Sequence, residues 1–453
     1  MDGLKKRIVI TVIGTHGDVQ PFVALALTLE RRGFSVVIAT TSDFEAFVSS
    51  HGIEYASLGG DVQAFLRQSQ FDNVMTKNAL LYAPGLLRAG QKVLKEAGKR
   101  AWQIAQGADA LIFQNATSFC IDIAEALKIP AILTVFQPIF PTTEFPYFDY
   151  GLPEMDTLMY RFSREPFARS PRIDPLLNKL SYVVQTAQQS FWDSPRDRLR
   201  TALGLRPKKK GNVHTGARGE LLTTLHAYSP LLSPQAGDWP DGHIITGFWR
   251  LDDITGWAPP DTFRRFLEAG TEPIYLGFGS MPWGAQRNSE IISKALSLWG
   301  GRVVIGKGWG GVKEELLPPT VHMIDRAPHS LLFPHLKAVV HHGGAGTTHT
   351  GLIAGRPSFL VPQFFDQPYW GQRVYELGLG PMPVRLRKLT PQILASALED
   401  LDATPAYALA AARMGDRLRL EDGTNCAVDV IEETMAEFRP LVERKVFALG
   451  ATP

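Results

Sequence analysis

Cysteine is nearly absent from this chain of 453 residues, which contains only Cys120 and Cys426. Two cysteines exclude a disulfide framework and a zinc site built from thiolates. Both lie in apolar segments with helical patterning. This scarcity is typical of proteins of a reducing cytoplasm, which is therefore the expected compartment.

An excess of charge of one sign is also lacking. The 47 Lys and Arg residues nearly balance the 45 Asp and Glu residues, so the sequence gives no basis for a nucleic-acid partner. The basic run Lys208–Lys210 is flanked by Pro and Gly and is interpreted as a solvated loop. The Asp-x-Asp motif Asp400–Asp402 falls in a helix-like stretch and is interpreted as a solvated face, so no metal is expected.

Long hydrophobic runs are missing as well. The first apolar run, Ile8–Ile13, ends at Gly14 after about six residues, so it predicts a buried strand rather than a signal peptide. No stretch approaches the ~18 apolar residues that a membrane span needs. We therefore expect no transmembrane segment, and any lipid contact must be peripheral.

Short β-branched runs alternate with amphipathic helical patterns over the first 140 residues. Strands that are apolar on both faces and separated by helices predict an α/β architecture with a parallel sheet. The rhythm is lost from 140 to 220 and restarts at Pro273–Phe278, which predicts a second domain of similar build. The expected division is a first Rossmann-like domain at 1–228, a linker at 229–260, a second domain at 261–410, and C-terminal helices at 411–453 that cross back.

Two places combine a strand, a Gly-rich turn and the start of a helix, which is the arrangement that binds anions. The second of them, Ala338–Thr348, has three glycines that let the backbone approach a pyrophosphate. The first, Gly14–Pro21, carries Asp18 at the helix start, where a carboxylate repels phosphate. This asymmetry suggests that one turn binds a nucleotide and the other offers a base.

Downstream of the second turn lies the pair Asp366 and Gln367, with aromatic neighbours. A carboxylate and an amide can together bind adjacent sugar hydroxyls, and aromatic rings can pack on a pyranose face. Taken alone, the pair is better explained by a capping or turn role.

At this point the stretch His341–Pro381 closely resembles the donor-binding signature of the UDP-sugar glycosyltransferases. Within that superfamily it is most similar to the sterol 3-beta-glucosyltransferase branch and the related antibiotic glycosyltransferases. Further matching motifs follow in the expected order: Gly14–Pro21, Asp238–Pro240, Thr246–Trp249 and Gly277–Met281. Residues 60–105 and 140–220 match no motif.

The resemblance implies a GT-B fold, in which two Rossmann-like domains face each other across a cleft, the first for the acceptor and the second for the nucleotide sugar. It implies an inverting transfer of a hexose, glucose from UDP-glucose, to a hydroxyl of an apolar acceptor such as a sterol, triterpenoid, macrolide or flavonoid. It implies no metal, and no cofactor besides the UDP-sugar co-substrate.

The resemblance also assigns roles to single residues. Asp18 falls at the position of the catalytic base. The positions that match the donor site are Ser280, His342, Gly344, Gly346 and Thr347 around the phosphates, and Asp366 and Gln367 at the sugar hydroxyls. The positions where plant relatives carry a nucleobase-stacking tryptophan and a ribose-binding glutamate correspond to Arg326 and Thr350, so UDP is favoured over TDP only weakly.

In plant relatives an aspartate partners the base, and here that position falls near Gln114 or Asn115, neither of which carries charge. Asp18 must then act without a relay, which a carboxylate can do because it has no tautomer to fix. The alternative for Asp18 is a helix N-cap. His16 can assist Asp18, bind the acceptor or satisfy the turn.

Other roles also stay open. His341 is interpreted as a strand-end residue more readily than as a phosphate ligand. Trp370 either packs beneath the sugar or fills the interdomain core. Phe136, Phe140 and Phe145, with Tyr147, Phe148, Tyr150 and Phe162, predict an aromatic acceptor pocket, although core packing explains some of them equally well. The rival functions are a transferase for a TDP-sugar or a polar glycan, and a non-catalytic nucleotide-sugar binding protein.

Overall fold

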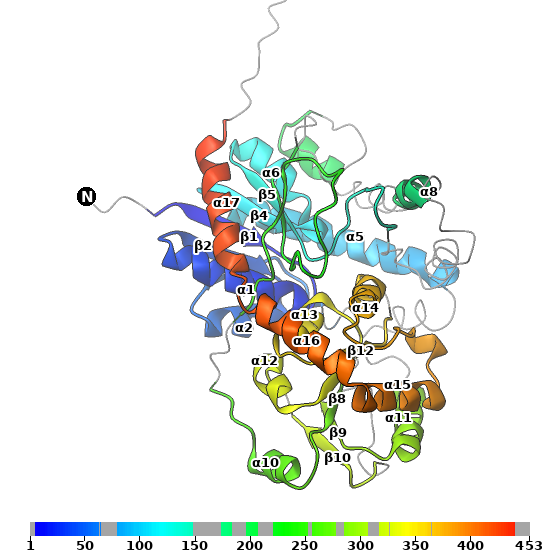
Figure 1. Ribbon diagram of the computed structural model, residues 1–453. Coiled ribbons are helices and arrows are strands. Elements are labelled where there is room, and N and C mark those ends of the chain that lie inside the picture. Colours follow the sequence, from blue (N-terminus) through cyan, green and yellow to red (C-terminus); the bar gives the residue numbers. More distant parts are fainter. Residues whose placement is uncertain are drawn as a thin grey trace, which may run out of the picture.

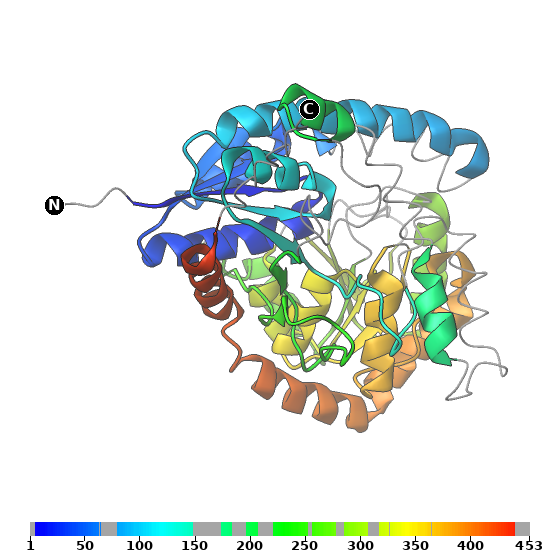
Figure 2. The same ribbon diagram turned by 90° about the horizontal axis from the view of Figure 1, so that it is seen from above.

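The computed structural model describes residues 5–62, 64, 79–147, 174–183, 196–206, 221–251, 256–277, 285–306, 317–325, 327–363 and 365–439. Within these ranges the chain forms two parallel sheets, each covered by helices on both faces (Figure 1). Viewed from above, the two halves lie one beside the other with helices on the outside (Figure 2). This is the α/β architecture that the alternation of strands and helices predicts.

The first sheet has seven parallel strands in the order β3-β2-β1-β4-β5-β6-β7. Its strands are β1 (Arg7–Thr11), β2 (Ser35–Thr40), β3 (Glu54–Ser57), β4 (Ala110–Gln114), β5 (Ala131–Val135), β6 (Thr224–His226) and β7 (His243–Ile245). The helices that follow these strands are α1 (His16–Arg31), η1 (Ser42–Phe44), α2 (Glu45–Ser50), α5 (Ala79–Ile104), η2 (Asn115–Thr117), α6 (Cys120–Leu127) and α8 (Asp174–Ser181). The strand β7 belongs to this sheet although its residues fall in the stretch predicted to be linker.

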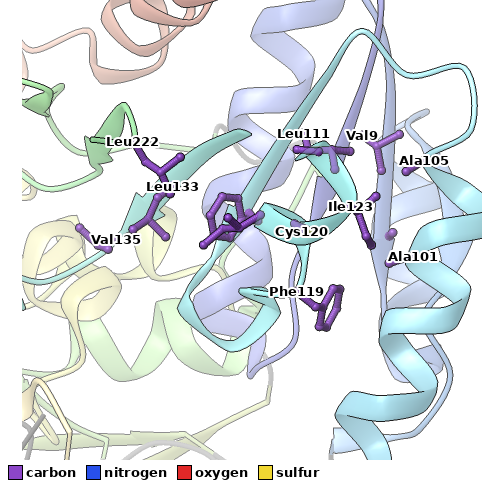
Figure 3. Packing of buried hydrophobic residues seen from close by; sticks show 14 of the residues in the cluster. Val9, Ala101, Ala105, Leu111, Phe119, Cys120, Ile123, Leu133, Val135 and Leu222 are labelled. Carbon is purple, nitrogen blue, oxygen red and sulfur yellow. The ribbon is translucent and has the colours of Figure 1, made fainter. Parts of the chain in front are cut away.

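Alternating side chains of β1 build both faces of this sheet. Val9 packs against α5 and α6, in the cluster that also holds Leu111 and Cys120 (Figure 3). Ile8 and Ile10 point to the opposite face and pack against α1. Because both faces are buried, the strand has to be apolar at every position, and this explains the uninterrupted run of β-branched residues in the sequence.

The second sheet has five parallel strands in the order β10-β9-β8-β11-β12. They are β8 (Ile274–Gly277), β9 (Val303–Gly306), β10 (Val321–Ile324), β11 (Ala338–His341) and β12 (Ser358–Leu360). Around them lie α10 (Asp261–Glu268), α11 (Ala285–Trp299), α12 (His329–Leu332), η4 (Phe333–His335), α13 (Ala345–Ile353), α14 (Gln367–Glu376), η5 (Leu386–Lys388), α15 (Pro391–Ala403) and α16 (Pro405–Leu418). Ile274 and Leu276 face α11 and α15, whereas Tyr275 faces η4.

The last helix, α17 (Gly423–Glu437), lies against α1 of the first domain, and Figure 1 shows the two side by side in red and blue. Ala427, Val428 and Ile431 bury their side chains in the cluster that α1 shares with the first sheet. Arg32 at the end of α1 adds ion pairs to α17, to Asp429 at 2.9 Å and to another carboxylate. The C-terminal segment therefore ties the two domains together.

The start of α1 lies on the side of the first domain that is turned towards the second domain. His16 begins α1 directly after the β1 turn, and His329 begins α12 in the second domain. His16 contributes to lowering the pKa of His329, after the larger effect of burial.

Candidate active site

The second Gly-rich turn follows β11 and is shaped by two glycines and a histidine. Gly343 has a φ of 95°, and a side chain there would press on the carbonyl of Gln367. The Gly343 N–H donates to Nδ1 of His341 at 3.0 Å. His341 is fully buried at the end of β11, so its packing agrees with the strand-end interpretation rather than with that of a phosphate ligand.

The helix that leaves this turn, α13, begins with free donors. Its N-cap is Gly344, and the N–H groups of Gly346 and Thr347 have no acceptor in the part of the chain that the structure describes. The hydroxyl of Thr350, in contrast, is bound to the carbonyl of Gly346 at 2.8 Å. A helix start with unused donors and no nearby carboxylate on the helix itself binds an anion such as a diphosphate.

His342 lies half-buried beside this helix start, with Nε2 next to the Gly344 backbone. Burial lowers the pKa of His342 to about 4, and His329 adds a smaller contribution in the same direction. The ring is therefore neutral at pH 7 and can donate a hydrogen bond through its N–H without carrying charge. His329 was not predicted from the sequence, because it belongs to no motif and its proximity to His342 is a tertiary contact.

The Asp366–Gln367 pair closes the other side of the turn. Oδ2 of Asp366 accepts the Ala345 N–H at 3.2 Å and the Trp370 indole N–H at 2.9 Å. Oε1 of Gln367 accepts the Gln363 N–H at 2.8 Å. The carboxylate is thus held at the start of α13, one residue before α14, where it can reach a sugar attached to a diphosphate in the turn.

The first Gly-rich turn is closed by its own residues. Thr15 is the N-cap of α1, and Asp18 is the third helical residue, so the pair forms a capping box. Oδ2 of Asp18 accepts the Thr15 N–H at 2.7 Å and the Thr15 hydroxyl at 3.0 Å. Asp18 is therefore not the N-cap itself, which corrects the alternative considered from the sequence, although it does share in capping.

The second oxygen of Asp18 is available for chemistry. Oδ1 has no hydrogen-bond partner among the residues that the structure describes. Burial raises the pKa of Asp18 above its ordinary value, and the hydrogen bonds from Thr15 act in the opposite direction. A carboxylate with a raised pKa is a stronger base, so capping through one oxygen and proton acceptance through the other are compatible.

Gln114 supports this turn, but not through Asp18. Its Nε2 donates to the Ile13 carbonyl at 2.7 Å, so the side chain fixes the backbone that leads into the turn. The hydroxyl of Thr117 reinforces the same corner by donating to the Thr11 carbonyl at 3.0 Å. Gln114 is one of the two residues expected near the position of the charged relay in plant relatives. In this chain its side chain supports the backbone of the turn.

His16 is exposed at the start of α1 and lies against an aromatic side chain. Its ring centroid is 4.4 Å from that of Phe47 on α2. The same ring contributes to lowering the pKa of His329 in the second domain. His16 therefore lies at the edge of the first turn, next to α2 and towards the second domain.

Of the predicted acceptor aromatics that the structure describes, some are buried in the core and others keep exposed surface. Phe140 is buried and contacts His243 with ring centroids 3.9 Å apart, and Tyr147 is also buried. Phe136 and Phe145 are half-buried, with Phe136 5.4 Å from the ring of Phe22 and Phe145 5.9 Å from that of Tyr369. The apolar pattern therefore reports core packing for Phe140 and Tyr147, because an aromatic-rich segment is equally suited to both roles.

Trp370 is fully buried in the interdomain core, where it packs against Tyr228 at a centroid distance of 5.6 Å. Its indole N–H is used by Asp366. The residue thus positions the Asp366 carboxylate, and its ring has no surface left to lie beneath a sugar. Five residues with predicted roles lie outside the described ranges. They are the donor-site candidates Ser280 and Arg326 and the acceptor candidates Phe148, Tyr150 and Phe162.

No group of three or more His, Cys, Asp or Glu side chains is arranged to hold a metal ion in the described ranges. The Asp-x-Asp motif lies on α15, where Asp402 is paired with Lys337. None of the described helices is long and apolar enough to cross a bilayer.

Two family models match the chain, one in each domain. The glycosyltransferase family 28 N-terminal domain matches residues 8–146, and the C-terminal domain of the erythromycin biosynthesis protein CIII-like family matches residues 307–432. Among solved structures, the glycotransferase of kitacinnamycin superposes with a TM-score of 0.65 at 18% identity, covering 96% of this chain and 100% of that one. The calicheamicin glycosyltransferase CalG4 gives 0.63 at 19% identity, covering 97% and 100%. These structures define the GT-B fold.

Curated relatives then narrow the family. Two sterol 3-beta-glucosyltransferases of Arabidopsis thaliana are 35% and 32% identical to the chain over 93% and 96% of its length, and one of Neosartorya fischeri is 30% identical over 99%. The chain spans 64%, 69% and 31% of these relatives' own lengths. The chain belongs to the UDP-glycosyltransferase superfamily, in the branch that holds the sterol 3-beta-glucosyltransferases and the antibiotic glycosyltransferases.

Proposed function

We propose that the chain is an inverting glycosyltransferase that moves glucose from UDP-glucose to a hydroxyl of an apolar, sterol-like acceptor. The observation that carries this proposal is the pairing of the two turns. One presents a carboxylate with an available oxygen, and the other presents helix N–H groups with no acceptor among the described residues. The names of the curated relatives support the sterol-like acceptor and the glucose donor.

In the proposed reaction, Oδ1 of Asp18 accepts the proton of the acceptor hydroxyl. The oxygen of that hydroxyl attacks the anomeric carbon of the donor sugar at the same time. The bond from that carbon to the diphosphate breaks, and the electron pair leaves with the diphosphate. The N–H groups of Gly346 and Thr347 and the ring of His342 stabilise the negative charge that grows there. Asp366 and Gln367 hold the sugar hydroxyls during the displacement.

These preorganised donors replace the divalent cation that other transferases use, so the proposed reaction needs no metal and no cofactor besides the UDP-sugar. UDP is preferred to TDP as the nucleotide. The low cysteine content supports an enzyme of the cytoplasm.

A screen of UDP-sugars and TDP-sugars against sterols, triterpenoids, macrolides, flavonoids and polar glycans, with products identified by mass spectrometry, tests this proposal. The run contains excess chelator. We expect a monoglucosylated sterol-like product from UDP-glucose. Activity that disappears in chelator and returns with Mg²⁺ or Mn²⁺ contradicts the metal-free mechanism, and products formed only on polar glycans contradict the acceptor class. Binding of UDP-glucose without any transfer points to the non-catalytic alternative.

A further inference from the structure

Three aromatic residues of the described chain lie close in sequence to the Asp366–Gln367 pair. Tyr369 is 4% exposed and its hydroxyl bonds to Ser233 at 2.5 Å, while Trp370 is completely buried. Phe365 is 45% exposed. Of these three rings, only that of Phe365 has surface left with which to contact a substrate.

The backbone of Phe365 is also exceptional. Its φ is 53°, and the only other non-glycine residue with positive φ in the described ranges is Lys128. Lys128 is the C-cap of α6, where a left-handed residue is common. Phe365 instead precedes Asp366, the N-cap of α14, and a bulky side chain disfavours this conformation, for which glycine is the ordinary choice. Such conformations persist where the surroundings enforce them, frequently at ligand sites.

The position of Phe365 relates it to the donor. The next residue, Asp366, is anchored to the Ala345 N–H at the start of α13. The carbonyl of Gln367 lies against Gly343 in the same turn. Phe365 is therefore one residue from a carboxylate fixed beside the diphosphate-binding turn. The C–H face of a pyranose is apolar and packs favourably on an aromatic ring.

We propose that Phe365 is a specificity-determining residue whose ring packs against the pyranose of the bound donor, while Asp366 and Gln367 bind the hydroxyls. This inference rests on the proposed function, because it presumes that a nucleotide sugar binds at the second turn. It assigns to Phe365 the stacking role for which Trp370 has no exposed surface.

Calorimetric titrations of Phe365→Gly with UDP-glucose and with UDP test the inference. We expect about a tenfold loss of affinity for UDP-glucose, UDP affinity close to that of the parent, and a melting temperature equal to or above that of the parent, because glycine relieves the left-handed backbone. Phe365→Tyr keeps a ring and is expected to keep the affinity. Tyr375→Ala is the matched control, since Tyr375 is 44% exposed at the far end of α14 and is expected to bind both ligands like the parent.

Unchanged affinity of Phe365→Gly for UDP-glucose overturns the inference. An equal loss for UDP and UDP-glucose also overturns it, because the variant then disturbs the turn as a whole. A loss confined to the KM of the acceptor assigns the ring to the acceptor and overturns the donor contact. The titrations report binding without turnover, so a parent that binds UDP-glucose but transfers nothing refutes the proposed function and leaves the stacking result valid.

Discussion

The two Gly-rich turns follow strands at different places in their sheets and end in opposite chemistry. β1 lies between β2 and β4, and β11 lies between β8 and β12. Each strand runs through a glycine turn into a helix, α1 or α13. The third helical residue is Asp18 in the first case and Thr347 in the second. The carboxylate closes its own helix start, whereas the threonine leaves N–H groups open.

This difference indicates how the side chain at the third helical position changes the donors that a turn offers, although Asp366 accepts the first N–H of α13 from outside that helix. A carboxylate there satisfies the helix end internally and repels a phosphate. A neutral residue leaves the donors and the positive helix end to an anion. In the proposed mechanism, these two strand–turn–helix elements therefore provide the base and the leaving-group site.

The largest expected effect comes from removing the base. Asp18→Asn keeps the size of the side chain and an oxygen for Thr15, but it cannot accept a proton at neutral pH. We expect turnover to fall by about 10²–10⁴-fold, with UDP affinity close to that of the parent. Steady-state kinetics, melting temperature and UDP titration on the same samples measure this.

The matched control for that variant is Thr15→Val, which removes the hydroxyl bond to Asp18 and costs about 1 kcal/mol of stability while leaving the base in place. If Asp18→Asn turns over within a few-fold of the parent, Asp18 only caps the helix, and His16 becomes the candidate base.

Making the second turn resemble the first is expected to have the next largest effect. Thr347→Asp places a carboxylate at the third position of α13, where it can close the helix start and repel the diphosphate. We expect UDP affinity to fall by about 100-fold, measured by calorimetry. Thr347→Asn has the same size without the charge and serves as the control. Equal affinities for the two variants would show that charge at this position is irrelevant.

Asp366 is expected to show a smaller effect that depends on the substitution. Asp366→Asn retains an oxygen for the Ala345 N–H and the Trp370 indole, so we expect weaker use of UDP-glucose with UDP affinity nearly unchanged. Asp366→Ala removes that acceptor and is expected to weaken UDP binding as well, by a few-fold. Donor KM and UDP affinity measured for both variants distinguish sugar contact from support of the turn. Identical behaviour of the two variants would contradict the dual role.

An effect on stability rather than on binding or turnover is a dependence on pH in which His349 takes part. Burial lowers the pKa of His349 to about 4, and its Nε2 accepts the Ser229 N–H at 3.1 Å. Because the unfolded pKa is about 6.5, this contribution is complete above pH 6.5 and is lost as pH falls towards 4. Chemical denaturation between pH 7 and 4 is expected to give a shallower slope for His349→Phe, by up to ~1.4 kcal/mol per pH unit. Parallel slopes for variant and parent would contradict this.

Much of the fold could be predicted because buried parallel strands have to be apolar throughout. Ala338–His341 is a strand as its β-branched run indicates, and the two Gly-rich turns were found from the same pattern. The three-residue strand β7 could not be found, since so short a segment has no periodicity. Its place in the first sheet depends on pairing with β6, which is a tertiary contact.

The limits at the site have a similar cause. The sequence shows that Asp18 brings a carboxylate to the first turn. Only the structure shows that α1 begins after the N-cap Thr15, which makes Asp18 the third helical residue. An aromatic residue such as Phe140 or Trp370 has the same character in a core and in a pocket, so its role depends on neighbours far away in the sequence. The left-handed backbone of Phe365 has no signal in the sequence, because phenylalanine rarely adopts it.

The stereochemistry of the product tests the division of labour between the two turns most directly. If Asp18 activates the acceptor on one side while the diphosphate leaves towards α13 on the other, a single displacement has to invert the anomeric carbon. NMR of the glucoside made from the α-linked donor UDP-glucose is therefore predicted to show a β-linkage. An α-linked product would contradict the account, because retention requires a second nucleophile or attack from the face of the leaving group.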